Sequence, residues 1–219
     1  MKVALLGFPQ SGKRTLFSLL TGHGVPPGRK EGEAVEGIAR VWDPRVDAIA
    51  AIAKPQRIKY ADVVYVLCPD VPAEGGGKRD WLDHARRCDA IAVLIRAFTA
   101  AEVYHPRGSV DAMRDRRDMA AELLLADLAM VETRLERLGK EKRAGQTPAQ
   151  AQEERVLIKC REALENEKWL NAIGLEPHEL QVVRSLGFLT LMPILWVDNV
   201  DEDQLSAQAA GRLLFSCKI

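Results

Sequence analysis

The spacing of two glycines and a lysine near the N-terminus constrains this chain more than any other feature. Gly7, Gly12 and Lys13 fit the pattern G-x-x-x-x-G-K, between an apolar run at residues 3–6 and a helical pattern at residues 12–20. Glycines at these positions allow several backbone N–H groups to converge on one anion, and the start of a helix favours negative charge. A strand, this loop and a helix in succession therefore predict an α/β fold with a phosphate-binding loop, or P-loop.

We expect this loop to hold the phosphates of ATP or GTP, with Lys13 reaching the β- and γ-phosphates. The next position usually carries Ser or Thr, whose hydroxyl binds Mg²⁺. Here it is Arg14, which has no lone pair for a cation, and Thr15 lies about 100° further round the helix. Arg14 either neutralises phosphate charge or extends into solvent, and we predict no metal ligand in the loop. The expected phosphate contacts are Gly7, Pro9, Gln10, Ser11, Gly12, Lys13, Arg14 and Thr15.

Strand and helix patterns alternate on both sides of a long charged segment in the middle of the chain. Residues 91–95 are apolar throughout, as expected for a central strand of a parallel sheet. Residues 43–54 read as a helix that starts at Asp-Pro and ends at Lys-Pro. Its expected buried face consists of Val46, Ile49, Ala50 and Ile52. The other expected strands are 38–42, 63–67, 189–197 and 213–216, the other short helices are 81–87 and 177–186, and the loops are 21–37 and 69–78.

The charged middle segment predicts two long helices. In the first, at residues 111–139, apolar residues recur at alternating spacings of four and three, which is a heptad pattern. These residues are Leu124, Leu128, Val131, Leu135 and Leu138. Gly145 interrupts the pattern, and Thr147 begins a capping box that starts a second helix ending near residue 170. We therefore expect a nucleotide-binding domain at residues 1–110 and 187–219, interrupted by an antiparallel coiled-coil domain at residues 111–186.

Composition excludes several classes of protein. The chain has 31 Lys and Arg against 31 Asp and Glu, so no overall basic field favours nucleic acid or a membrane surface. No run approaches the roughly 18–20 apolar residues of a membrane span, and no secretory signal is present. We expect a cytoplasmic protein without a membrane partner. The 4 cysteines and 4 histidines are dispersed, which predicts free thiols and no metal site.

Several segments of the chain are similar to one family. Residues 7–17, GFPQSGKRTLF, resemble the pattern G-x-P-N-x-G-K-S-T-L-F of the YchF-like, Obg-related P-loop NTPases. Residues 43–47 and 54–57 resemble that family's D-P-R-x-D and K-P-Q-R segment, and residues 126–128 its A-D-L. Residues 186–191 are similar to its L-S-F-L-T-L. These segments occur in the family's order along the whole chain.

The resemblance implies a Ras-like core with a coiled-coil insertion, a C-terminal TGS domain that would follow Ile219, ATP hydrolysis and association with ribosomes. It also implies a base-binding motif N-x-x-E, carried here by Asn199 and Glu202, with a final base-contacting loop at Ser216, Cys217 and Lys218. The expected partners are a purine nucleotide and, through the helical arm, the ribosome or a protein. The alternative for each base-binding residue is an ordinary polar loop after a strand.

The chain departs from this family where Mg²⁺ and the γ-phosphate are held. The family's D-x-A-G-L segment can be aligned with this chain in two ways. Without gaps, Leu67 takes the place of its Asp and Asp70 the place of its Gly. With a shift of three residues, Asp70 takes the place of the Asp and Ala73 that of the Gly. The loop after Thr21 has no further Thr to serve as a magnesium ligand. We therefore expect a purine-nucleotide-binding protein with little dependence on Mg²⁺ and weak hydrolysis. The alternatives are a non-enzymatic interaction module with a vestigial P-loop and an active ATPase with another metal arrangement.

Overall fold

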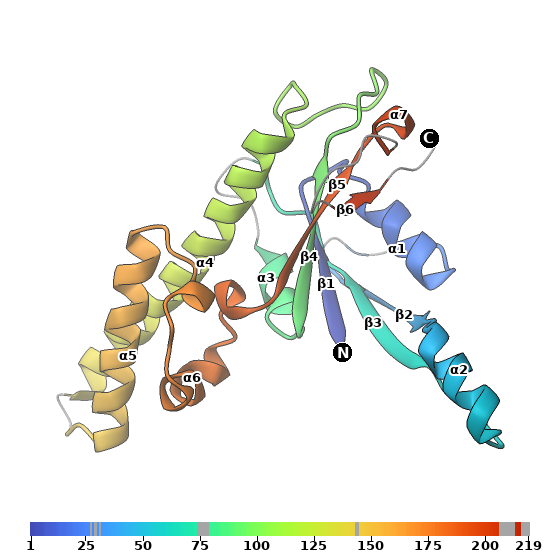
Figure 1. Ribbon diagram of the computed structural model, residues 1–219. Helices are drawn as coiled ribbons and strands as arrows, with labels where there is room; N and C mark the ends of the chain where they lie inside the picture. Colours follow the sequence, from blue (N-terminus) through green and yellow to red (C-terminus); the bar gives the residue numbers. More distant parts are fainter. Residues whose placement is uncertain are drawn as a thin grey trace. The chain divides into compact units, whose positions relative to one another are not determined.

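The computed structural model of the chain describes residues 1–26, 28, 30, 32–73, 79–142, 145–205 and 213–215. By its contacts the chain divides into two compact units (Figure 1). The sheet unit consists of Met1–Val110 with Leu195–Ile219, and the helical unit is Asp111–Ile194. The chain thus leaves the sheet after its first four strands and returns to it at the fifth.

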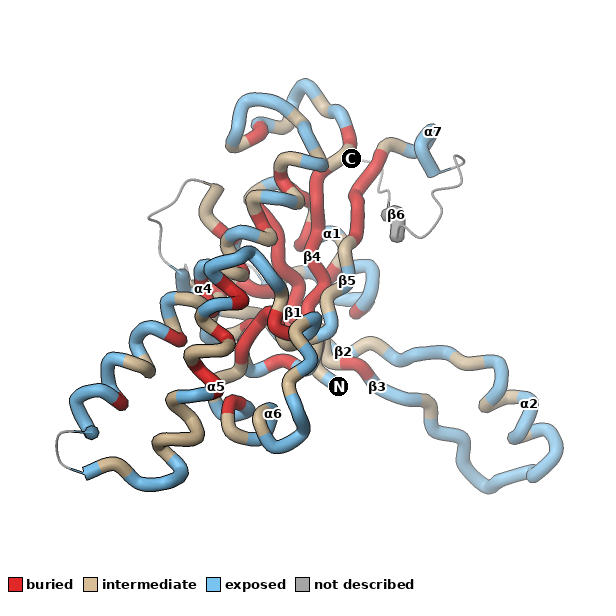
Figure 2. Tube along the Cα trace, turned by 60° about the vertical axis from the view of Figure 1, so that its left-hand side comes forward, coloured by how far each residue is buried: buried red, intermediate tan, exposed pale blue. Residues whose placement is uncertain are grey.

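A six-stranded sheet forms the first unit, in the order β2-β3-β1-β4-β5-β6. β1 pairs in parallel with both β3 and β4, and β2 pairs with β3 antiparallel at one edge. The central strands β1 and β4 are buried along almost their whole length (Figure 2), which explains their unbroken apolar sequences. The α/β class predicted from the sequence is therefore confirmed. The strands are β1 (Lys2–Leu6), β2 (Val35–Val41), β3 (Ala61–Leu67), β4 (Ala90–Arg96), β5 (Ile194–Asn199) and β6 (Leu213–Phe215).

Helix α1 (Lys13–Thr21) follows the P-loop and packs on the sheet through Phe17. Its buried positions are Lys13, Phe17 and Thr21, which recur every four residues. The helical pattern at residues 12–20 predicts Leu16, Leu19 and Leu20 on the buried face, but Leu19 is 62% exposed. The helix is rotated because its first residue, the P-loop lysine, faces inward, and the residues one and two turns later must share that face.

Two further helices connect strands of the same sheet. Helix α3 (Asp80–Ala85) precedes β4 and buries Trp81 completely. Helix α2 (Pro44–Ala53) connects β2 to β3, and Asp43 caps its first turn, as the sequence predicts. Its predicted buried face is wrong, because none of its residues is buried. A fourth helix, α7 (Glu202–Leu205), follows β5.

Helix α4 (Ala112–Glu141) and helix α5 (Pro148–Glu165) pack together in the helical unit. Thr147 and Gln150 form the predicted capping box, in which the Gln150 N–H donates to Thr147 Oγ1 at 3.2 Å and the Thr147 N–H to Gln150 Oε1 at 2.9 Å. All five heptad residues belong to the core of this unit, together with residues of α5 and α6 (Pro177–Val183). The heptad pattern therefore identified one packing face of α4, on which Val131 and Leu138 are buried, but it did not include Met119 and Leu123, which are fully buried.

A buried carboxylate holds the last turn of the helical unit. Asp127 of α4 accepts hydrogen bonds from the Leu189 N–H at 3.1 Å, the Thr190 N–H at 2.8 Å and the Thr190 hydroxyl at 2.9 Å, and Asp127 and Thr190 are fully buried. Residues Leu189–Leu191 form a 3-10 turn around it, labelled η4. The strand expected at residues 189–197 therefore begins only at Ile194, because Asp127 takes the N–H groups that a sheet would use.

Candidate phosphate and nucleotide site

The P-loop leaves the end of β1 and requires glycine at two positions of close approach. A Cβ atom at Gly7 would lie 2.6 Å from the Leu94 carbonyl oxygen of β4 and 2.7 Å from Ser11 Oγ. At Gly12 the backbone has φ +96°, and a Cβ there would overlap the Asn199 side-chain amide of β5. Neither site tolerates a side chain, so the two glycines of the motif allow the loop to lie directly across the strand ends.

Lys13 lies on the inward face of the loop, with 4% of its side chain exposed. Its ammonium donates to the carbonyl oxygens of Gly7 at 2.7 Å and Phe8 at 3.2 Å, and to the Asp70 carboxylate. Burial lowers the pKa of Lys13, while the neighbouring Asp70 carboxylate opposes that change. Three acceptors thus surround the ammonium, and a phosphate would extend or replace this set.

Asp70 reaches this lysine because the chain after β3 folds back along the P-loop. The Val71 N–H donates to the Gly7 carbonyl at 3.2 Å, so the Gly7 oxygen serves both this segment and Lys13. The Asp70 side chain is 50% exposed, with one side on Lys13 and the other open to solvent. Leu67, in contrast, is buried in the sheet core at 1% exposure. Of the two alignments left open by the sequence, the structure brings Asp70, and not residue 67, to the phosphate loop.

Two further features, at adjacent residues of the loop, point to ligand binding. Ser11 is 2% exposed, and its hydroxyl has no hydrogen-bond partner among the described residues. A buried hydroxyl normally finds one, since leaving it unpaired costs about 1–3 kcal/mol. Gln10 holds a left-handed conformation at φ +62°, which strains a residue other than glycine or asparagine by about 1–3 kcal/mol. Strain and an orphan polar atom in adjacent residues are typical of a binding loop.

Asn199 connects the loop to the end of β5. It is 2% exposed, and its side-chain amide donates to the Ser11 carbonyl at 3.1 Å, while its own carbonyl accepts from the Ala97 N–H at 2.7 Å. The sequence assigned Asn199 to the base, and the structure adds a positioning role toward the P-loop. The other expected base residue, Glu202, lies exposed at the start of α7, three residues further on.

Asp201 lies between these two residues and has a different function. Its carboxylate accepts from the Thr99 N–H at 3.0 Å and the Thr99 hydroxyl at 2.9 Å, which ties the turn after β5 to the turn after β4. The predicted third part of the base site, at Ser216, Cys217 and Lys218, lies outside the described residues. Two of the five predicted base-binding residues, Asn199 and Glu202, therefore lie on either side of the turn that Asp201 holds.

The residues present do not fit a magnesium ion held in the usual way. Arg14 and Thr15 are both exposed on the first turn of α1, and Leu67 is a core residue. Among the described residues no group of three or more His, Cys, Asp or Glu side chains is arranged to hold a metal. Asp70 is the carboxylate that contacts the loop, and it is paired with Lys13. Positions 14 and 67 therefore lack the hydroxyl and the carboxylate that the family pattern has there.

Known proteins similar to this chain match it over nearly its whole length. No family model matches it. The ribosome-binding ATPase YchF of Haemophilus influenzae is 34% identical over 210 residues, or 92% of this chain and 57% of that protein. The protein of the same description from Escherichia coli O157:H7 is also 34% identical over the same shares, and that from Bacillus subtilis is 30% identical over 94% of this chain and 58% of its own. This chain spans a little more than half the length of these relatives.

A solved structure agrees with the sequence comparisons. The YchF GTPase of Schizosaccharomyces pombe superimposes with a TM-score of 0.77 and 25% identity, covering 100% of this chain and 65% of that one. The similarity covers both the sheet unit and the helical unit of this chain, in agreement with the motifs at residues 7–17, 43–57 and 186–191. The chain belongs to the YchF-like, Obg-related family of P-loop proteins.

Proposed function

We propose that this chain binds a purine nucleoside di- or triphosphate at the P-loop and hydrolyses it slowly or not at all. The main support for this proposal is the buried Lys13 ammonium on the inward face of the P-loop. The atoms around Gly7 and Gly12 leave no room for a side chain at either position. The unpaired Ser11 hydroxyl and the exposed Arg14 add a polar group and a second cation beside it. Burial is the largest cause of the lowered pKa of Lys13, and the Arg14 charge contributes slightly in the same direction.

Slow hydrolysis follows from the missing metal ligands. In P-loop enzymes a metal ion bridges the β- and γ-phosphates and offsets the charge that develops in the transition state, which is usually a large contribution to catalysis. Here an arginine occupies the hydroxyl position and Leu67 is a core residue. Arg14 offsets ground-state phosphate charge as much as transition-state charge, so it favours binding over turnover.

Calorimetric titration with ATP, ADP, GTP and GDP, each with and without Mg²⁺, tests this proposal directly. We expect near-stoichiometric binding of at least one of these nucleotides and an affinity that changes less than tenfold when Mg²⁺ is replaced by EDTA. Turnover measured in parallel is expected near the uncatalysed background. No binding of any nucleotide would leave the second candidate, a non-enzymatic interaction module whose P-loop lysine is neutralised by Asp70. Tenfold or greater tightening by Mg²⁺ together with turnover would support the third, an ATPase with another metal arrangement.

We further propose that the helical unit makes a contact with the ribosome or with a protein. The relatives described above are named ribosome-binding ATPases, and α4 with α5 presents a long charged surface around its heptad core. None of the helices in the described part of the chain is long and apolar enough to cross a bilayer. Replacing residues 119–170 by a short linker should leave nucleotide affinity unchanged and abolish cosedimentation with ribosomes. Retained cosedimentation would contradict the helical contact and leave the nucleotide proposal standing.

A point variant on this surface avoids the large deletion. A groove in the helical unit lies beside Leu124, Leu125 and Trp169, and Leu125 is 50% exposed there. Leu125→Glu introduces a charge into this groove without removing a core side chain. Leu180→Glu is a matched control, because Leu180 of α6 is 41% exposed and does not line the groove. We expect the first variant, and not the second, to weaken cosedimentation.

A further inference from the structure

The connection between β2 and β3 carries an apolar helix that nothing in the described chain covers. Helix α2 has 10 residues, of which residues 48–53 are all Ala or Ile, and none of the ten is buried. Ile49 is 65% exposed and Ile52 is 86% exposed. Figure 2 shows α2 exposed over most of its surface and far from the buried strands of its own unit. A helical segment that is apolar all round is normally buried, and no described residue buries any side chain of residues 48–53.

The strands that lead to α2 add to the same exposed surface. We call residues 38–62 the finger. On β2, Ile38 is 63% exposed, and Trp42 just after the strand is 69% exposed. The opposite face of β2 is closed by α1, since a Cβ at Gly37 would lie 2.5 Å from Thr21 Cγ2 and 2.7 Å from the Phe17 ring. Ile38 and Trp42, which alternate with Gly37, therefore point away from the core, and the described residues of the sheet unit leave both of them exposed.

The finger is nevertheless an ordered structure. Asp43 caps α2 through the Arg45 N–H at 2.9 Å and pairs with the Arg45 guanidinium at 2.6 Å. The Tyr60 hydroxyl donates to the Asp47 carboxylate, which connects the residue before β3 to helix α2. Both carboxylates at the base of the helix are thus used within the finger. An ordered apolar projection suits recognition, because little conformational entropy is lost when it binds a partner.

The tip of the finger carries only positive charge. Between Asp47 and Asp62 the sequence has three cations, Lys54, Arg57 and Lys59, and no carboxylate. All three are exposed, as is Ile58 among them at 47%. A partner must therefore offer apolar surface for the isoleucines and negative charge at its border. The distribution matches a protein interface, in which an apolar centre with an aromatic anchor is surrounded by charged groups that remain partly in water.

We propose that the finger inserts α2 and Trp42 into an apolar groove of a partner protein, with carboxylates of that protein bordering the groove beside Lys54, Arg57 and Lys59. A second copy of this chain fits poorly, because two such tips would bring like charges together. A nucleic acid would satisfy the three cations and leave Ile49, Ile52 and Ile58 in contact with phosphates and water. This contact uses residues away from the P-loop and does not depend on nucleotide binding.

Site-specific photo-crosslinking followed by affinity measurement tests the proposal on the full chain. A photoreactive benzoylphenylalanine replaces Ile52 in one variant and Leu19 in the other; Leu19 of α1 is also an exposed apolar residue, at 62%. We expect the Ile52 probe to give one dominant protein adduct in cells, and the Leu19 probe to lack it. The adduct is identified by mass spectrometry, and that protein is purified and titrated with wild-type chain and with two groups of variants.

We expect Ile49→Ser with Ile52→Ser, and separately Lys54→Glu with Arg57→Glu and Lys59→Glu, to weaken this affinity by tenfold or more. Leu19→Ser should change it less than twofold, and all variants should keep the wild-type melting temperature and nucleotide affinity, because the altered side chains are exposed. The proposal is overturned if the Ile52 adduct is RNA, lipid or a second copy of the chain, if no adduct exceeds the Leu19 control, or if the purified protein binds the charge-reversed variant as tightly as wild type.

Discussion

Replacing Asp70 by asparagine isolates the one contact that opposes phosphate binding in this site. In the free protein the Asp70 carboxylate neutralises the buried Lys13 ammonium. A bound polyphosphate brings its own negative charge to the same ammonium, so the carboxylate must either move into solvent or lie against a like charge. Asparagine has nearly the same shape and no charge. We therefore expect Asp70→Asn to bind ATP and GTP more tightly than the wild type.

The size of the effect follows from the exposure of the two partners. Lys13 is 4% exposed and Asp70 is 50% exposed, so the pair lies between two limits. Fully exposed pairs contribute about 0–1 kcal/mol, and breaking a fully buried pair costs about 3–5 kcal/mol. An intermediate value of about 1.5 kcal/mol corresponds to roughly a tenfold gain in affinity. The free variant should also unfold at lower temperature than the wild type, and saturating nucleotide should remove that difference.

Isothermal titration in EDTA provides the assay, with Asp62→Asn as the matched control. Asp62 is an exposed residue of β3 in the same unit, so its replacement makes the same change in net charge away from the P-loop. We expect the control to stay within twofold of wild type. Unchanged or weaker binding by Asp70→Asn in EDTA would refute the competition. A loss of affinity that occurs only with Mg²⁺ would instead make Asp70 a metal ligand.

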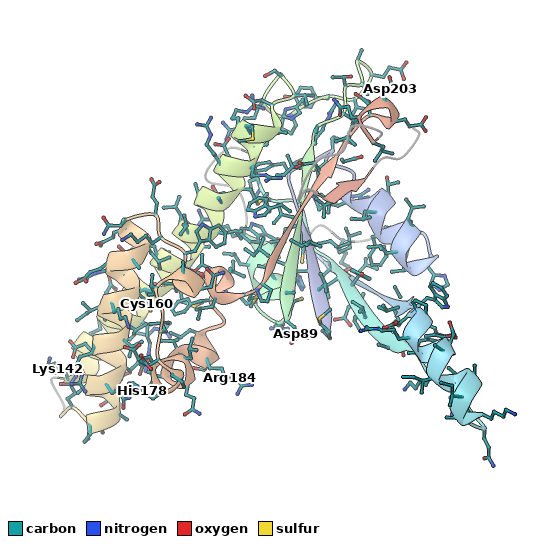
Figure 3. The ribbon with its side chains drawn as sticks, in the orientation of Figure 1. Asp89, Lys142, Cys160, His178, Arg184 and Asp203 are labelled. Atoms are coloured by element: carbon teal, nitrogen blue, oxygen red, sulfur yellow. The ribbon has the colours of Figure 1, made fainter. Side chains whose placement is uncertain are left out.

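Four further predictions follow from the contacts of single residues. Lys13→Ala should abolish nucleotide binding while the chain stays folded; titration combined with circular dichroism checks this, and an affinity within threefold of wild type would contradict it. Arg14→Ser should increase the Mg²⁺ dependence of ATP binding without restoring turnover, as measured by titration and phosphate release. Asp127→Ala leaves three buried donors unpaired, two of them on Thr190, and should lower the free energy of unfolding by about 2–4 kcal/mol in denaturant titration. Cys160 (Figure 3) is fully buried, and burial raises the pKa of its thiol to about 11, so it should resist alkylation at pH 8 until the protein is unfolded.

Local sequence patterns predicted the parts of the fold that depend on neighbouring residues. The P-loop, the cap at Asp43 and the capping box at Thr147 each involve groups within six residues of one another, and the structure has all three. The heptad residues of α4 were also found, because their spacing along one helix determines which face can pack. The α/β class followed from the order of these local elements.

Contacts between distant segments were not predictable in the same way. Asp127 and Thr190 belong to two segments that resemble family motifs, and they lie 63 residues apart in the sequence. No sequence feature indicated that the Asp127 carboxylate binds the Thr190 N–H. The contact between Asn199 and the Ser11 carbonyl spans 188 residues. In both cases the sequence shows a polar residue within or at the end of an apolar segment, which does not identify its partner.

The predicted buried face of α2 failed for another reason. Ala and Ile at residues 48–53 indicate that this helix prefers an apolar surface, but the pattern is the same whether that surface belongs to the chain or to a partner. The structure resolves this ambiguity within the described residues, since Ile52 is 86% exposed there. The exposure of α2 in the structure is therefore better evidence for an external contact than its apolar sequence alone.

The departures of the P-loop region from the family pattern change its charge in a consistent direction. Where the family pattern has Ser, Asp and Gly, this chain has Arg14 with either Leu67 and Asp70 or Asp70 and Ala73, and in both registers the formal charge of the three positions rises from −1 to 0. The positive charge is exposed on the first turn of α1, and the negative charge is already paired with Lys13. A site of this kind needs less help from a divalent cation to hold a polyphosphate, and it also lacks the ligands that would fix one. Retained phosphate affinity and lost metal chemistry are thus expected from the same substitutions, which is why binding in EDTA and turnover in Mg²⁺ must be measured on the same preparation.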